Sequence, residues 1–438
     1  MDICLESRGF EGQARRFPSM AYFRNGLLMQ IQPYVTVESN DAPPAAKWRT
    51  LALCALAALL EGFDNQSMGV AAPRVIAEFA LSTQQASFIF SATPFGLFLG
   101  AAIGGRVADL FGRKRALITS LMLFGMFSVL TSFATGAGWL LLARFLTGLG
   151  LGGALPNFVS LASEATLGRQ RLSIVTLIMA AMPFGGAISA VVALGAQLGW
   201  GWRSIFYIGG FAPMILALLM IRYLRDTARL PMGAGSATPP AGVRFALFGG
   251  NRLPTTLLLW LGFFFTQMVL LLMLNWLPQF VIGLGFSRTQ ASWTSVCFNL
   301  GGSMGAYFLG SLHAGQRRRT WVLVTYGGMA ITLLGVASID KSFAMAALAC
   351  ALAGIFIIGA QLVLFALAPL YYGVSIRGTG VGASVSLGRL GSVVGPLFAG
   401  LLMTGGGSSA TVLLGIIPFV LVAGGAAFSL TWRQQAPD

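Results

Sequence analysis

Apolar runs of about 20 residues recur along the whole chain, and this feature limits its possible folds most strongly. Hydrophobic residues make up 56% of the 438 residues and charged residues only 9%, whereas a soluble domain carries about 25% charged residues. A membrane β-barrel would need short strands of alternating polarity, and the sequence has no such pattern. We place twelve spans between Arg49 and Trp432. The predicted fold is an all-α polytopic membrane protein with twelve transmembrane helices.

The distribution of Lys and Arg predicts on which side of the membrane each loop lies. With the amino terminus in the cytoplasm, Arg144 and Arg389 fall within spans, and the outer loops contain Arg74, Arg203, Arg288 and Lys341. All other basic residues are then cytoplasmic, as basic loop residues of membrane proteins usually are. We therefore expect a multi-pass protein of the cell inner (plasma) membrane with both termini in the cytoplasm. This rule explains the net charge of +15 without a nucleic-acid partner.

The chain contains an internal repeat. Pro73 and Ser82 align with Pro278 and Ser287, and the run Gln-Ala-Ser that ends at Ser87 recurs as the run that ends at Ser292. Six spans have thus been duplicated, which predicts two six-helix halves in the same orientation around a central site, with alternating access by rocking of the halves. The predicted parts are a disordered cytoplasmic tail (1–46, which an upstream start codon would also explain), an N-terminal half (47–222), a cytoplasmic linker (223–253) and a C-terminal half (254–433).

The loop after the second span reads GRVADLFGRKR, from Gly105 to Arg115. It resembles the signature loop of the major facilitator superfamily, with Gly105, Asp109, Gly112 and Arg113 at the family spacing. The resemblance implies the fold of that family and a conformational latch at these residues. We expect Gly105 to allow close helix packing, Asp109 to accept hydrogen bonds from a helix amino terminus or Arg113, and Gly112 to turn the chain.

Ionisable residues inside the spans are expensive and indicate function by default. Glu61 and Asp64 lie in the first span, and their i, i+3 spacing places them on one face of a helix. Arg389, in the eleventh span, lies at about the depth of Glu61, roughly 18 Å above its cytoplasmic end. A buried guanidinium can bind a carboxylate through two hydrogen bonds, and a buried acid can take up and release a proton. The pattern predicts an anion site beside a proton site, although a salt bridge that only balances charge is the alternative.

The first-span string EGFD, from Glu61 to Asp64, is similar to that of the aromatic acid:proton symporters, a branch of the same superfamily. Within this branch the chain resembles most the 3-(3-hydroxyphenyl)propionate transporters. The resemblance implies uptake of a small aromatic acid with protons, with Glu61 and Asp64 in proton coupling and Arg389 in substrate binding. We expect Asn275 to add a polar contact to the substrate. Arg144 is a further candidate for substrate binding, with a structural role as the equal alternative.

Other functions remain as alternatives. The first is proton-coupled efflux of a drug or metabolite, although the string MPFGG in the fifth span lacks the full glycine-rich run typical of drug:proton antiporters. The second is a non-transporting sensor or channel-like protein. An enzyme is disfavoured because we find no nucleophile–base pair, nucleotide loop or metal-ligand cluster. We expect no metal and no cofactor.

Overall fold

The computed structural model describes residues 44–433, except 167–169, 196–198, 225–242, 313–316, 340–341 and 374–375. Within these ranges the chain forms helices and no strand. The predicted tail lies outside the described residues except for its last few positions, which begin the first helix. Most of the predicted linker lies outside them too, and its described part contains the short helix α7 (Val243–Phe248).

Long helices account for both predicted halves. The N-terminal half consists of α1 (Pro44–Glu78), α2 (Thr83–Phe111), α3 (Arg113–Ser132), α4 (Ala137–Glu164), α5 (Gln170–Gly195) and α6 (Arg203–Tyr223). The C-terminal half consists of α8 (Leu253–Gly283), α9 (Arg288–Leu312), α10 (Arg318–Ala337), α11 (Phe343–Leu367) with the 3-10 turn η2 (Ala368–Tyr371), α12 (Arg377–Thr404), α13 (Ser409–Gly415) and α14 (Ile417–Leu430).

The helices confirm the predicted fold class. In the described residues, 10 helical segments are long and apolar enough to cross a membrane. The long helices α1 and α9, which are richer in polar residues, supply the other two of the twelve spans. The last span is broken into α13 and α14 close to Pro418, because proline has no backbone N–H with which to continue the helical hydrogen bonds. Below, "outer" denotes the Glu78 end of α1, in line with the predicted topology.

The internal repeat is visible in atomic detail. At the outer end of α2, the N–H of Ser82 donates to Gln85 Oε1 at 2.9 Å and the N–H of Gln85 donates to Ser82 Oγ at 3.2 Å. Ser287 and Gln290 form the same pair of bonds, at 2.9 and 3.2 Å, at the start of α9. These reciprocal caps satisfy N–H groups that a helix start leaves free. Both halves therefore begin their second span in the same way.

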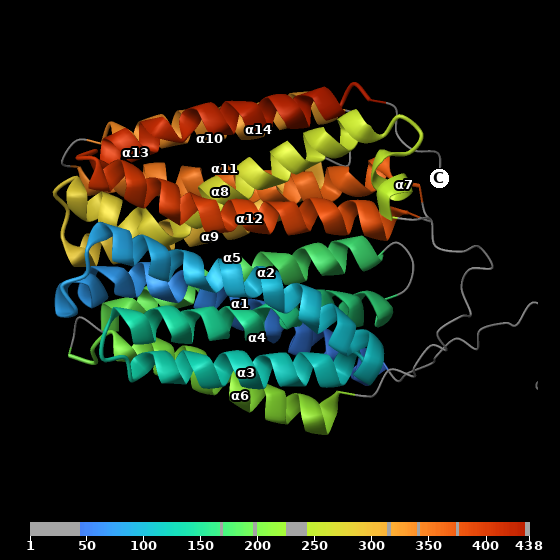
Figure 1. The fold of residues 1–438 in the computed structure, drawn as a ribbon, viewed down its shortest axis with the longest axis horizontal. Coiled ribbons are helices and arrows are strands. Elements are labelled where there is room, and N and C mark those ends of the chain that lie inside the picture. The colour runs from blue at the N-terminus through green and yellow to red at the C-terminus, as the bar shows by residue number, and fades with distance from the viewer. Residues whose placement is uncertain are drawn as a thin grey trace, which may run out of the picture. The chain divides into compact units, whose positions relative to one another are not determined.

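The two halves pack through α1, α2 and α5 on one side and α8, α12 and α9 on the other (Figure 1). One cluster of buried apolar side chains joins both halves and includes an edge-to-face pair between Phe90 of α2 and Trp276 of α8, with ring centroids 5.0 Å apart. A second, separate cluster contains only residues of the N-terminal half, among them Leu51, Phe124 and Leu161. With the predicted topology, the shared cluster includes the outer part of the N-terminal half and the separate cluster its cytoplasmic part.

An ion pair at the outer surface braces the N-terminal half. Arg203 Nη2 lies 2.7 Å from Glu78 Oε1, and Arg203 Nε donates to the carbonyl of Ser132. Trp202 Nε1 donates to the other carboxylate oxygen at 2.6 Å. The hydrogen bond from Arg203 holds the pKa of Glu78 below its ordinary value. These contacts connect the ends of α1, α3 and α6.

Candidate functional site

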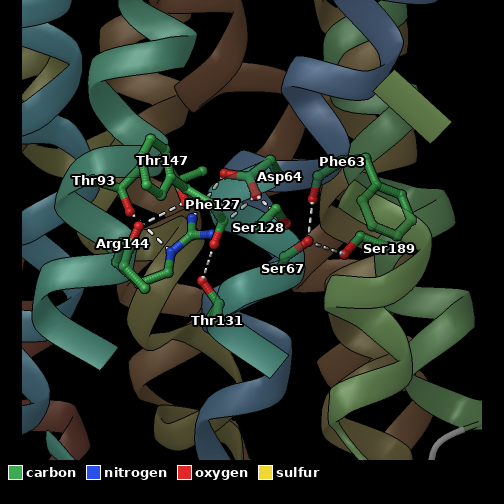
Figure 2. Close-up of polar contacts among 11 residues, drawn as sticks. Phe63, Asp64, Ser67, Thr93, Phe127, Ser128, Thr131, Arg144, Thr147 and Ser189 are labelled. Atoms are coloured by element: carbon green, nitrogen blue, oxygen red, sulfur yellow. Dashed lines mark hydrogen bonds and ion pairs between the residues drawn. The ribbon is translucent and has the colours of Figure 1, made fainter. Parts of the chain in front are cut away.

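Two charged residues form a buried pair in the N-terminal half. Asp64 lies in α1 and Arg144 in α4, and their side chains are 0% and 1% exposed. Arg144 Nη2 donates to Asp64 Oδ2 at 2.8 Å and Nη1 donates to Oδ1 at 3.0 Å (Figure 2). This is the two-bonded geometry that a guanidinium and a carboxylate prefer.

Neighbouring groups complete the pair. Arg144 Nε donates to Thr93 Oγ1 at 3.0 Å, and Ser128 Oγ donates to Asp64 Oδ1 at 3.4 Å (Figure 2). The guanidinium carbon also lies 5.6 Å from the ring centroid of Phe206, within reach of a cation–π contact. Buried charges are tolerated when they are paired and hydrogen-bonded, and this pair meets both conditions within one half of the protein.

Glu61 has a different environment from Asp64, although it lies only one turn away on α1. It is 1% exposed, and its Oε2 is buried with no hydrogen-bond partner among the described residues. The charges of Arg389 and Asp64 both act on its carboxyl group. A buried carboxylate oxygen without a donor is costly, and a proton on the carboxyl group of Glu61 removes this cost.

Arg389 belongs to the opposite half. It lies in α12 with 8% of its surface exposed, and its Nη1 donates to the carbonyl of Leu97 in α2 at 3.2 Å. It interacts electrostatically with Glu61, but among the described residues it forms no ion pair with a carboxylate within 4.0 Å. A guanidinium has five N–H donors, so a single carbonyl leaves most of its hydrogen-bonding capacity available.

The structure therefore divides the predicted charge cluster into two separate pairs. The sequence predicted one cluster of Glu61, Asp64 and Arg389 and left Arg144 between two roles. In the structure Asp64 is bound by Arg144, whereas Arg389 interacts with Glu61. The depths already contained this signal. The first predicted span ends at Val70 and the fourth begins at Trp139, both on the outer side. At 1.5 Å per residue, Asp64 lies about 9 Å and Arg144 about 8 Å from these outer ends.

Asn275 was expected to contact substrate. It lies in α8, is 4% exposed, and its Nδ2 donates to the carbonyl of Leu271 in the same helix at 2.9 Å. Its Cα lies against Gly69 of α1, where a Cβ would approach to 3.1 Å. The observed role of Asn275 is thus at the packing surface between the two halves, and substrate contact stays a prediction.

The structure describes several residues of the predicted latch, and their role as a latch stays a prediction. Gly112 joins α2 to α3 with φ of 90°, a conformation that side chains rarely adopt, so the turning role of Gly112 is confirmed. The expected close packing at Gly105 is wrong, because a Cβ there would meet nothing within 4 Å. Gly104 packs closely instead, against Gly153 of α4. Arg113 forms an ion pair with Glu164 at the end of α4, and the side chain of Asp109 lies outside the described residues.

The described residues contain no group of three or more His, Cys, Asp or Glu that could hold a metal ion. The site has instead the ion pair of Asp64 and Arg144 inside one half, and the carboxyl group of Glu61 and the guanidinium of Arg389 in opposite halves. Such an arrangement can bind an anion and a proton at a point where the halves meet.

Comparison with known proteins gives consistent matches. Residues 54–386 match the model of the Major Facilitator Superfamily. The 3-(3-hydroxy-phenyl)propionate transporter of Escherichia coli (strain K12) is 42% identical, over 88% of this chain and 94% of that protein. The 4-hydroxybenzoate transporter PcaK of Pseudomonas putida is 29% identical over 84% and 88%, and the gallate transporter of Pseudomonas putida is 30% identical over 82% and 86%.

Solved structures share the fold at low sequence identity. A bacterial homolog of the human lysosomal transporter Spinster, in an inward-facing and occupied conformation, has a TM-score of 0.71 and 19% identity, and covers 91% of this chain and 100% of its own. A D-xylose-proton symporter also has a TM-score of 0.71 and 19% identity, with 87% and 97% covered. At this level of identity the two structures bear on the fold alone.

The ion pair between Asp64 and Arg144 makes a prediction for stability. Asp64→Asn leaves the buried guanidinium without its counter-charge, and breaking a buried pair in this way costs about 3–5 kcal/mol. Asp64→Asn/Arg144→Gln removes both charges and should melt at a higher temperature than Asp64→Asn alone, when the purified proteins are heated in detergent. Losses that simply add in the double variant would contradict the pairing.

Proposed function

Because the chain belongs to the Major Facilitator Superfamily, we propose that it carries a small aromatic carboxylate into the cell together with protons, by alternating access. Relatives that match most of the chain are named for hydroxyphenylpropionate, 4-hydroxybenzoate and gallate, all of which bear a carboxylate on an aromatic ring or its side chain. The proposed location is the inner (plasma) membrane. The observation that carries the proposal is the buried Arg389, which interacts electrostatically with Glu61 of the opposite half and forms no ion pair with any described carboxylate.

Arg389 is the proposed anchor for the substrate carboxylate. Its guanidinium donates to one backbone carbonyl and retains donors that a carboxylate can accept in pairs. Arg144 is less suited to this task, since Asp64 and Thr93 already accept from its three nitrogens. We therefore assign Arg144 to the internal pair and substrate binding to Arg389.

Glu61 is the proposed proton carrier, and charge balance links it to the substrate. Arg389 brings one positive charge to a site with little access to water, and this charge can be balanced by ionised Glu61 or by the substrate carboxylate. When the substrate binds, two anions face one cation, and an unbalanced buried charge is expensive. A proton on Glu61 restores neutrality and turns the unpartnered carboxylate oxygen into a neutral hydroxyl group, which is less costly to bury. The substrate and the proton thus bind together and leave together.

Asp64 has a supporting role in this scheme. Its carboxylate is held by Arg144 at 2.8 and 3.0 Å, so its charge is already balanced. The pair ties α1 to α4 at a point one turn after Glu61 in α1. Proton coupling, which the sequence assigned to both acids, falls mainly to Glu61.

Reconstituted vesicles with an imposed pH gradient test the proposed function. With acid outside, the wild-type protein should accumulate a phenylpropionate, benzoate or phenylacetate against its concentration gradient, and a protonophore should abolish the accumulation. In the same vesicles, Glu61→Gln should exchange labelled for unlabelled substrate but lose accumulation, because glutamine mimics the protonated acid and carries no proton. Glu78→Gln, in the same helix but at the outer surface, is the matched control and should accumulate normally.

Full accumulation by Glu61→Gln would contradict the role of Glu61 in proton coupling. Movement of aromatic acids only outward would support efflux, and no movement of any aromatic acid would reject the proposed function.

Arg389→Lys tests the carboxylate anchor. Lysine keeps the positive charge but loses the planar fork that binds both carboxylate oxygens, so affinity for the aromatic acid should fall about tenfold, the equivalent of about 1.4 kcal/mol. Isothermal titration of purified protein measures this change. Arg377→Lys, at the cytoplasmic end of the same helix, is the control. Equal affinity in Arg389→Lys and wild type would place the carboxylate elsewhere.

A further inference from the structure

Two buried amides connect the halves. Gln66 of α1 and Asn299 of α9 are each 1% exposed. Gln66 Nε2 donates to the carbonyl of Leu274 in α8 at 3.0 Å, and Asn299 Nδ2 donates to Gln66 Oε1 at 2.9 Å. Gln66 is thus bonded to two helices of the opposite half at once.

The string MPFGG of α5 supplies the other side of this contact. A Cβ on Gly186 would overlap Asn299 Oδ1, so the Asn299 amide can hold its observed position only while residue 186 has no side chain. A Cβ on the preceding Gly185 would overlap the backbone of α1 at Leu59, and a Cβ on Gly62 would overlap the backbone of α5 at Met182. Gly186 therefore packs against Asn299 of the opposite half, whereas Gly185 packs α5 against α1.

The contact belongs to the outer part of the bundle under the predicted topology. Gln66 is about 25 Å from Arg49 along α1, in a hydrocarbon core about 30 Å thick. Nearby contacts between the halves include Ser91 Oγ, which donates to the carbonyl of Val393 in α12 at 2.8 Å, and the ring pair of Phe90 and Trp276. The apolar cluster shared by both halves contains the outer part of the N-terminal half but not its cytoplasmic part.

We propose that Gln66, Asn299 and Gly186 form the outer gate of the transporter, a clasp that is closed in this structure and must open whenever the site faces outward. The inference rests on the proposed function, because alternating access requires the halves to separate on the outer side. Amides suit a reversible clasp, since water can replace their hydrogen bonds at small net cost, whereas an exposed pair of charges would respond to salt.

The clasp lies on the helix that carries the proton site. Gln66 and Glu61 are both in α1, and the backbone contact between Gly62 and α5 makes α1 and α5 one packed unit. Opening of the clasp therefore moves Glu61 relative to Arg389 of the opposite half. The same motion would separate the proposed proton carrier from its counter-charge.

Two variants disrupt the clasp, one by removing a hydrogen-bonding group and the other by adding bulk. Asn299→Ala removes the amide, and Gly186→Ala adds a methyl group in the position of Asn299 Oδ1. Ser303→Ala is the matched control, because Ser303 lies one turn further along α9 and its hydroxyl donates to the carbonyl of Asn299 within the same helix. A single cysteine at position 91, placed in a background without the native cysteines, reports outer opening through its reaction with a membrane-impermeant thiol reagent.

Asn299→Ala and Gly186→Ala should each raise the rate of labelling of Ser91→Cys from outside about fivefold, the effect of one lost buried hydrogen bond on the closed state. Both should still bind the aromatic acid from outside but transport it more slowly, and Ser303→Ala should match wild type. Unchanged labelling and transport in both clasp variants, with an active wild type, would overturn the gate. An inactive wild type that nevertheless shows faster labelling in both variants would reject the proposed substrate and keep the gate.

Discussion

The electrostatic interaction between Glu61 and Arg389 is the feature on which the proposed transport depends. These residues lie in opposite halves, α1 and α12, so their interaction exists only while the halves hold a particular arrangement. Within the part of the chain that the structure describes, Glu61 Oε2 has no hydrogen-bond donor and Arg389 donates to a single carbonyl. Ionisable groups inside a membrane protein are expensive, and these two support the proposal that a proton and an anion complete the site during transport.

The neighbouring pair of Asp64 and Arg144 provides the contrast. It is enclosed in one half, satisfied by Thr93 and Ser128, and needs nothing from outside. The two acids of the string EGFD, one turn apart, thus have different partners: Arg144 binds Asp64, and Arg389 interacts with Glu61. Backbone contact at Gly62 and Gly185 joins α1 to α5, so the proposed clasp at Gln66 and the proposed proton carrier Glu61 belong to one packed unit.

The sequence predicted the fold well because apolar runs, loop charges and the repeat each carry a strong signal. It also identified Glu61, Asp64 and Arg389, since charges inside spans are rare. It did not assign Arg144 to Asp64, although their depths agree, because the packing of four helices decides which side chains meet. The clasp was missed for another reason: Gln66 and Asn299 are uncharged and look like ordinary polar residues until the halves are assembled. Gly105 and Gly104 illustrate the same limit of sequence-based prediction. They are adjacent, and only the packing of the helices decides which of them contacts α4.

Infrared difference spectroscopy of the purified protein tests most directly whether Glu61 carries the proton. Addition of an aromatic acid should increase the band of a protonated carboxyl group in the wild-type protein, and this change should be missing in Glu61→Gln and present in Glu78→Gln. An undiminished band in Glu61→Gln would assign the proton to another carboxyl group and contradict the coupling between Glu61 and Arg389.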